Sequence, residues 1–127
     1  MSDDTHHVYE IGTTALHYNK IEELLRNHTR LELSEMACTK IQECRDYLDR
    51  KAENPDAPIY GVTTGFGSLC SRSISPSELS TLQENLIKSH SCSIGDPIDP
   101  VIVKIMLLLK AHALSMGFSG VQVETVQ

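Results

Sequence analysis

The sequence has no tryptophan and only two phenylalanines among its 127 residues. The hydrophobic core must therefore be built from leucine, isoleucine, valine and methionine, and this length suits one domain with a modest core. The chain also lacks a basic patch, because its 17 acidic and 11 basic residues are interspersed and give a formal net charge of -6. That pattern argues against a nucleic-acid partner.

Metal-binding and export signals are missing as well. The four cysteines (Cys38, Cys44, Cys70 and Cys92) include no pair two residues apart and have no histidine at zinc-finger spacing, so we expect no metal site. The N-terminus has no basic region followed by an apolar run, which predicts no secretory signal. The longest apolar stretch, 101–116, is shorter than the roughly 20 residues of a bilayer span. We therefore expect a cytoplasmic protein with free thiols and no membrane partner.

Local patterns predict a mainly α-helical chain with a short N-terminal β element, organised as one domain over residues 1–127. The alternation Val-Tyr-Glu-Ile before Gly12 is typical of a strand, and Ser34, Ser75-Pro76 and Asp99-Pro100 are typical helix starts. In chain order, the predicted elements are a strand over 8–11, a helix over 16–26, an extended piece over 31–33, a helix over 35–51, an extended piece over 59–62, and helices over 76–90 and 101–116.

The last of these helices is unusually apolar. Its only polar residues are Lys104, Lys110, His112 and Ser115. A helix of this composition is expected to be buried nearly all round, and we expect part of its cover to come from outside this chain. After it, Ser119-Gly120-Val121-Gln122 resembles a capping box, which predicts a further helix of several turns. We therefore expect the sequence to be the N-terminal part of a larger protein.

The chain is organised around the stretch Tyr60-Gly-Val-Thr-Thr-Gly-Phe-Gly67. Its spaced glycines break both helical and strand periodicity, which predicts a loop. A mobile loop with a phenol at its entry suits a part that closes over a ligand. Taken alone, the spacing favours an ordinary surface turn with a partly buried tyrosine. The loop residues singled out beside Tyr60 are Gly61, Thr63, Thr64, Gly65, Phe66 and Gly67.

Four ordered blocks, including this loop, resemble the aromatic amino-acid ammonia-lyases and aminomutases. They are the 60–67 stretch, Leu-Gln-Glu-Asn-Leu at 82–86 before Ser89-His90, Gly-Asp-Pro at 95–97, and the segment from 108 to 121 with its Gly-Phe-Ser-Gly turn. The resemblance is weak from about residue 8 and strong from 58 to 121. It implies the N-terminal part of the ammonia-lyase (aspartase-like) helical fold.

The pair Ser89-His90 is similar to the histidine-specific branch of this family. Phenylalanine-type enzymes usually place two apolar residues there, and some tyrosine-type enzymes place His then Leu. Some tyrosine aminomutases also have Ser-His, so a tyrosine aminomutase or tyrosine ammonia-lyase fragment stays open as an alternative. A second alternative is a stand-alone helical module without catalytic activity that associates through its apolar helix.

The resemblance implies that the complete enzyme eliminates ammonia from histidine to give urocanate. A methylidene-imidazolone group, formed by the protein itself from Ala-Ser-Gly, captures the substrate, and a tyrosine phenolate removes a β-proton. Tyr60 matches that base, and His90 matches the residue that contacts the ring of the substrate. A phenol ordinarily has a pKa of about 10, so such a base needs nearby cations, dipoles or hydrogen bonds that stabilise its phenolate.

The sequence also departs from the family pattern. Its 127 residues contain no Ala-Ser-Gly, so we expect the chain alone to be inactive. Ser93 stands where the family usually has glycine, His112 where asparagine is common, and Gln122 where arginine is common. Because enzymes of the family are homotetramers with shared active sites, the resemblance implies a homo-oligomer or a missing C-terminal part as the partner.

Overall fold

The computed structural model describes residues 8–53, 59–65, 67 and 74–127. They divide into two compact units, one within 1–47 and 98–127 and the other within 48–97, and each is described by itself. The described residues contain four α-helices and a single two-stranded sheet near the N-terminus. The expectation of a mainly helical chain with a short β element is therefore confirmed.

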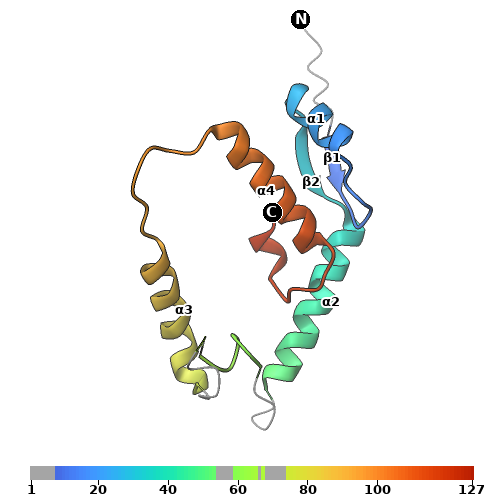
Figure 1. The fold of residues 1–127 in the computed structure, drawn as a ribbon. Coiled ribbons are helices and arrows are strands. Elements are labelled where there is room, and N and C mark those ends of the chain that lie inside the picture. Colours follow the sequence, from blue (N-terminus) through green and yellow to red (C-terminus); the bar gives the residue numbers. More distant parts are fainter. Residues whose placement is uncertain (1–7, 54–58, 66, 68–73) are drawn as a thin grey trace, which may run out of the picture. The chain divides into compact units, whose positions relative to one another are not determined.

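A strand, a helix and a second strand open the first unit (Figure 1). β1 (Val8–Ile11) and β2 (Arg30–Leu33) pair in parallel, with Val8 opposite Arg30 and Ile11 opposite Leu33. Parallel strands need a crossover connection, and α1 (Tyr18–Arg26) provides it. The two predicted extended segments are thus confirmed, and they are neighbours in one sheet.

Three side chains from distant parts of the sequence form a buried apolar cluster in the first unit. Ile11 from β1, Leu24 from α1 and Leu108 from α4 (Pro100–Ser115) are buried together. Asp99 caps α4 as predicted, because its carboxylate accepts a hydrogen bond of 2.7 Å from the Val101 backbone N–H. Apolar burial therefore places α4 beside the β1–α1–β2 element, as Figure 1 shows.

Two hydrogen bonds attach the C-terminal turn of α4 to the segment after β1. The hydroxyl of Ser115, which is fully buried, donates to the Gly12 carbonyl at 2.9 Å. His112 Nε2 donates to the Thr14 carbonyl at 2.8 Å. The histidine at this position, which departs from the family pattern, therefore serves as a structural donor that joins residues 98 positions apart.

The helix that follows the sheet, α2 (Glu35–Ala52), packs closely on the end of α4. It begins as predicted, because the Ser34 hydroxyl accepts a hydrogen bond of 3.2 Å from the Ala37 N–H. Gly117, which ends α4, has a φ of 74°, and a Cβ built there would lie 2.7 Å from the Lys40 carbonyl oxygen. This position therefore needs glycine both for its backbone conformation and for its close contact with α2.

The prediction that α4 is buried nearly all round is wrong for this chain. Only Leu108 and Ser115 are buried, because the sheet, α1 and α2 cover one side of the helix. Six large apolar side chains of α4 are between 38% and 65% exposed: Val101, Ile102, Val103, Met106, Leu107 and Leu109. Cover from outside the chain remains a prediction.

The end of the chain also differs from its prediction. Ser119 and Gln122 form no capping box: the helical turn is a 3-10 helix over Val123–Thr125, and the side chain of its N-cap residue, Gln122, makes no capping hydrogen bond. Instead, the Arg45 guanidinium on α2 donates to the Gly120 carbonyl at 3.2 Å. The segment after α4 is thus held by α2 rather than by its own helical cap.

The main element of the second unit is α3 (Pro76–His90). It starts and ends as predicted, and Glu78 lies in its first turn. The Ser75 hydroxyl donates to the Glu78 carboxylate at 2.6 Å, so the expected cap residue binds a side chain rather than a backbone N–H. Residues 54–58, between the predicted helix over 35–51 and the predicted extended piece over 59–62, lie outside the described residues.

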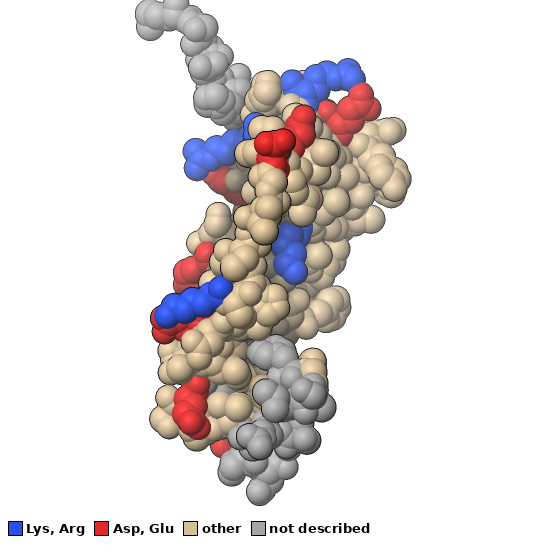
Figure 2. All heavy atoms as spheres, turned by 60° about the vertical axis from the view of Figure 1, so that its left-hand side comes forward, with Lys and Arg blue, Asp and Glu red and all other residues tan. Residues whose placement is uncertain are grey.

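The described surface carries charges of both signs. Figure 2 shows lysine, arginine, aspartate and glutamate side chains interspersed on one face of the molecule. Cys38, Cys44 and Cys92 are free thiols, whereas Cys70 lies outside the described residues. Across the described part of the chain, no helix combines the length and apolar character that crossing a membrane requires.

Candidate functional site

Tyr60 lies in a tight turn, which corrects the prediction of an extended segment over 59–62. The N–H groups of Val62 and Thr63 both donate to the Ile59 carbonyl, at 3.0 and 2.9 Å. Gly61 has a φ of 71°, a left-handed conformation that favours glycine, so the chain can reverse directly after the tyrosine. The turn leaves the Tyr60 side chain 65% exposed.

Two threonine hydroxyls hold this turn together. Thr63 Oγ1 accepts from the Ile59 N–H at 2.8 Å, and Thr64 Oγ1 accepts from the Gly61 N–H at 3.2 Å. The Thr64 hydroxyl is buried and donates to the Gly65 carbonyl at 3.0 Å, so its hydrogen-bonding capacity is used. Sequence reasoning placed both threonines in the loop but missed these contacts, although threonine commonly bonds to nearby backbone in turns.

Of the other predicted loop residues, the structure describes only some. Gly65 is buried and Gly67 is exposed, whereas Phe66 lies outside the described residues. The Ile74 N–H donates to the Thr63 carbonyl at 3.0 Å. This bond places the turn beside the residues that lead into α3, as Figure 1 also shows.

The structure does not bring Tyr60 and His90 together. The turn is attached next to the first residue of α3, and His90 is the last residue of this 15-residue helix. At about 1.5 Å per residue, the two ends of α3 are about 22 Å apart. The two main candidate residues therefore lie at opposite ends of one helix, and this chain alone does not assemble them into one site.

Ser89 and His90 form a hydrogen-bonded group at the end of α3. The Ser89 hydroxyl donates to the Leu86 carbonyl at 2.9 Å. His90 Nδ1 lies 2.9 Å from both Ser89 Oγ and the Leu86 carbonyl oxygen. Because the serine already donates its one proton and a carbonyl only accepts, Nδ1 must carry the imidazole proton to bond either oxygen. A neutral His90 then presents Nε2, on an exposed side chain, as an acceptor.

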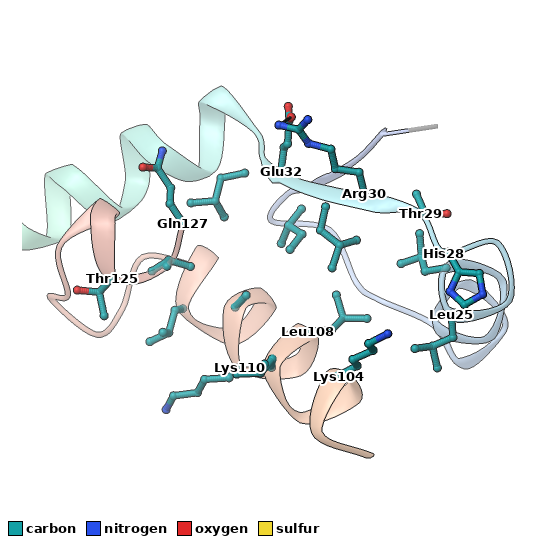
Figure 3. A pocket seen from close by; sticks show the side chains of 18 residues that line it. Leu25, His28, Thr29, Arg30, Glu32, Lys104, Leu108, Lys110, Thr125 and Gln127 are labelled. Carbon is teal, nitrogen blue, oxygen red and sulfur yellow. Dashed lines mark ion pairs between the residues drawn. The ribbon is translucent and has the colours of Figure 1, made fainter. Parts of the chain in front are cut away.

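An open groove in the first unit contains none of the predicted site residues. It has a volume of about 850 Å³ and lies between β2, α4 and the last three residues. Figure 3 shows Leu108 pointing from α4 into this groove, whereas the head groups of Arg30 and Glu32 point away from it. The groove is therefore the uncovered edge of the core rather than a cluster of reactive groups.

The described residues also offer no metal centre. Among them, no three histidine, cysteine, aspartate or glutamate side chains lie close enough together to hold a metal ion. The chemistry available in the described part of the chain is thus a phenol on a glycine turn and an imidazole acceptor at a helix end.

Comparison with known proteins settles the family. The sequence model of the family described as aromatic amino acid lyase matches residues 16–127. The chain belongs to the aromatic amino acid lyase family. Among curated members, histidine ammonia-lyase 2 of Fusobacterium nucleatum is 40% identical over 120 residues, which is 94% of this chain and 23% of that enzyme.

Solved structures of aromatic amino acid lyases share the fold of the chain. Histidine ammonia-lyase from Trypanosoma cruzi is 34% identical, with a TM-score of 0.77 over 95% of this chain and 23% of its own. Tyrosine aminomutase from Streptomyces globisporus has a TM-score of 0.82 at 24% identity, over 92% of this chain and 22% of its own. The predicted lyase fold is thereby confirmed, and the chain spans less than a quarter of the length of these relatives.

Proposed function

We propose that the chain is the N-terminal part of a histidine ammonia-lyase, whose complete form converts L-histidine to urocanate and ammonia. The observation that carries this proposal is the 40% identity to histidine ammonia-lyase 2 of Fusobacterium nucleatum across 94% of the chain. Tyrosine aminomutase is the second candidate, because Ser89-His90 fits both branches. It is supported less well, since its likeness at 24% identity concerns the fold alone.

In this proposal Tyr60 is the general base. Its side chain is 65% exposed on a turn held by Thr63 and Thr64, so the phenol is accessible to a substrate. A base acts only within hydrogen-bond reach of the proton that it removes. The loop must therefore close onto a substrate that other parts of the enzyme hold, and Gly61, Gly65 and Gly67 are its proposed moving parts.

His90 is the proposed contact for the substrate ring. With Nδ1 bonded to the Leu86 carbonyl or to Ser89, its Nε2 accepts a hydrogen bond from the N–H of a substrate imidazole. Ser89 is a positioning residue in this account, because its hydroxyl, together with the Leu86 carbonyl, accepts from His90 Nδ1 and so favours the proton on that nitrogen. A phenolic substrate could donate to the same nitrogen, which is why the pair does not separate histidine from tyrosine.

The electrophilic group of the family does not fit this chain. None of the 127 residues belongs to an Ala-Ser-Gly sequence, so the methylidene-imidazolone would be supplied by residues outside it. We accordingly propose that the chain alone does not turn over histidine. Its proposed partner is the remainder of the lyase subunit within a cytoplasmic homo-oligomer. We propose no nucleic-acid or membrane partner.

A fusion tests the proposed activity directly. The chain would be joined, in register, to the part of the Fusobacterium nucleatum enzyme that it does not match, and urocanate formation would be followed by ultraviolet absorbance. We expect turnover of L-histidine in preference to L-tyrosine. Because Tyr60 is the proposed base, Tyr60→Phe should lower kcat by about 100- to 10,000-fold.

Tyr18→Phe is the matched control, because it removes the hydroxyl of an exposed tyrosine at the start of α1. This control should leave kcat within about twofold of the parent fusion. Preferential turnover of L-tyrosine would favour the aminomutase or tyrosine-lyase alternative. Equal activity of the Tyr60→Phe and Tyr18→Phe fusions would rule out Tyr60 as the base.

A further inference from the structure

The outer side of α4 carries a regular apolar row that nothing in the first unit covers. Its members follow one another at steps of four, three and four residues: Ile102, Met106, Leu109 and Ala113. All four side chains are exposed. We call this row the outer seam. Alternating steps of three and four residues keep side chains on one line along a helix, which is the pattern of a helix-packing seam.

The outer seam and the core side of α4 are different sides of the helix. Leu108 and Ser115 are buried against the first unit. Leu108 lies one residue before Leu109 and Ser115 lies two residues after Ala113, and at 3.6 residues per turn both offsets point away from the row. Lys110 lines the edge of the groove, and Figure 3 shows its ammonium group pointing away from the groove into which Leu108 points. The core of the first unit therefore does not compete with the outer seam for the same side chains.

We infer that the outer seam is the docking face for an α-helix with its own apolar row and a carboxylate opposite Lys110. Steps of three and four residues suit a partner helix that crosses at a shallow angle of about 20°. The small side chain of Ala113 allows that helix to approach closely near the end of α4. Lys110 flanks the seam directly after Leu109, and in the described part of the chain it makes no ion pair.

The charge pattern decides between two occupants. A second copy of α4 would bring its own Lys110 and no carboxylate, because residues 100–115 include neither aspartate nor glutamate. Parallel pairing of two copies would thus place like charges beside a desolvated seam, and antiparallel pairing would leave each Lys110 without a carboxylate partner. A helix from the remainder of the lyase subunit is the occupant that we assign. This choice rests on the proposed function. It also rests on the length of the relatives, because the chain covers only 23% of each of the two histidine ammonia-lyases compared above.

Binding between two separate polypeptides tests the inference. The 127-residue chain is mixed with the unmatched part of histidine ammonia-lyase 2 from Fusobacterium nucleatum, and the dissociation constant is measured. Leu109→Glu places a charge within the seam and should raise Kd about 100-fold or more. Leu107→Glu is the matched control: it is the same substitution on the same helix, at a side chain that is 65% exposed but borders the groove. It should change Kd less than about threefold.

A second matched pair tests the charge. Lys110→Glu should raise Kd about tenfold or more. Lys104→Glu should change it less than about threefold, because Figure 3 shows the Lys104 ammonium group turned toward the groove and that of Lys110 turned away from it. Circular dichroism and thermal unfolding of each variant check that the chain itself remains folded. Since both leucines are exposed in the chain alone, neither glutamate substitution should lower its melting temperature by more than about 3 °C.

Three results would overturn the inference. They are no complex with the parent chain, equal effects of Leu109→Glu and Leu107→Glu, and a dimer of the chain alone that Leu109→Glu dissociates. The last result would assign the seam to a second copy. The proposed function fails separately: a fusion that makes no urocanate while the seam variants still weaken binding refutes the activity but not the docking face.

Discussion

Different kinds of contact stabilise each of the two units internally. In the first unit, hydrogen bonds join residues 103 and 98 positions apart, between Ser115 and Gly12 and between His112 and Thr14. In the second unit, the hydrogen bonds that the Ile59 carbonyl and the two threonine hydroxyls form at the Tyr60 turn span one to four residues, and the bond from Ile74 to Thr63 spans eleven. The first unit has a core that spans the sequence, whereas the bonds of the Ile59 carbonyl and of the threonine hydroxyls that shape the Tyr60 turn are local.

This difference separates the scaffold from the proposed chemistry. Long-range apolar contacts and hydrogen bonds form and break together, which gives the first unit the character of a cooperative fold. A loop held by local backbone bonds can open without disturbing that fold. A loop that is to close over a substrate must come from this less stable part of a protein.

The largest expected effect is on the core of the first unit. Leu108→Ala should lower its free energy of unfolding by about 2 kcal/mol, the low end for such a substitution because the site borders the open groove. Leu109→Ala, one residue later but 46% exposed, should cost less than about 1 kcal/mol. Chemical denaturation of both variants measures the difference. Equal effects would mean that α4 does not pack on the sheet through Leu108.

A smaller effect is expected at the contact between α4 and α2. Gly117→Ala adds a Cβ 2.7 Å from the Lys40 carbonyl oxygen, which forces the backbone to shift. Gly95→Ala also has a positive φ, of 107°, but its Cβ would meet nothing within 4 Å. Gly117→Ala should therefore be about 1 to 2 kcal/mol more destabilising than Gly95→Ala in thermal unfolding. The reverse order would contradict the close packing of the two helices.

The smallest effect on global stability is expected in the Tyr60 turn. Thr63→Val keeps the shape of the side chain but removes the oxygen that accepts from the Ile59 N–H. The unfolding free energy of the first unit should change by less than about 0.5 kcal/mol, while hydrogen exchange at the Ile59 amide becomes faster. Thr39→Val, on the exposed surface of α2, is the control and should leave that amide unchanged. Unchanged exchange in both variants would show that the threonine does not hold the turn.

Local signals in the sequence predicted the elements of the fold well. Ser34 and Asp99 mark the helix starts through side-chain caps that involve only a few neighbouring residues. The parallel pairing of β1 with β2 and the bond from His112 to Thr14 could not be predicted, because they depend on residues far apart in the sequence. The burial of α4 was overestimated for the same reason, since composition does not say how much of a helix one chain can cover.

The candidate site was predicted only in part. The motif identified Tyr60, Ser89 and His90, and the structure adds the hydrogen bonds around each residue. The motif did not predict that Tyr60 lies in a turn rather than in an extended segment, since the Ile59 carbonyl bonds and the Thr63 and Thr64 hydroxyls compete locally with extended backbone. The separation of Tyr60 from His90 follows from the length of α3, which was predicted, and from the Ile74–Thr63 bond that attaches the turn to its start, which was not.

Native-state hydrogen exchange on the 127-residue chain tests the contrast between the two units most directly. The Ser34 amide, which donates to the Ile11 carbonyl at 3.0 Å, reports on the first unit, and the Val62 and Thr63 amides, which donate to Ile59, report on the turn. We predict that the turn amides, after correction for intrinsic rates, exchange at least about 100-fold faster than the Ser34 amide. Equal protection of the two sets would contradict the account.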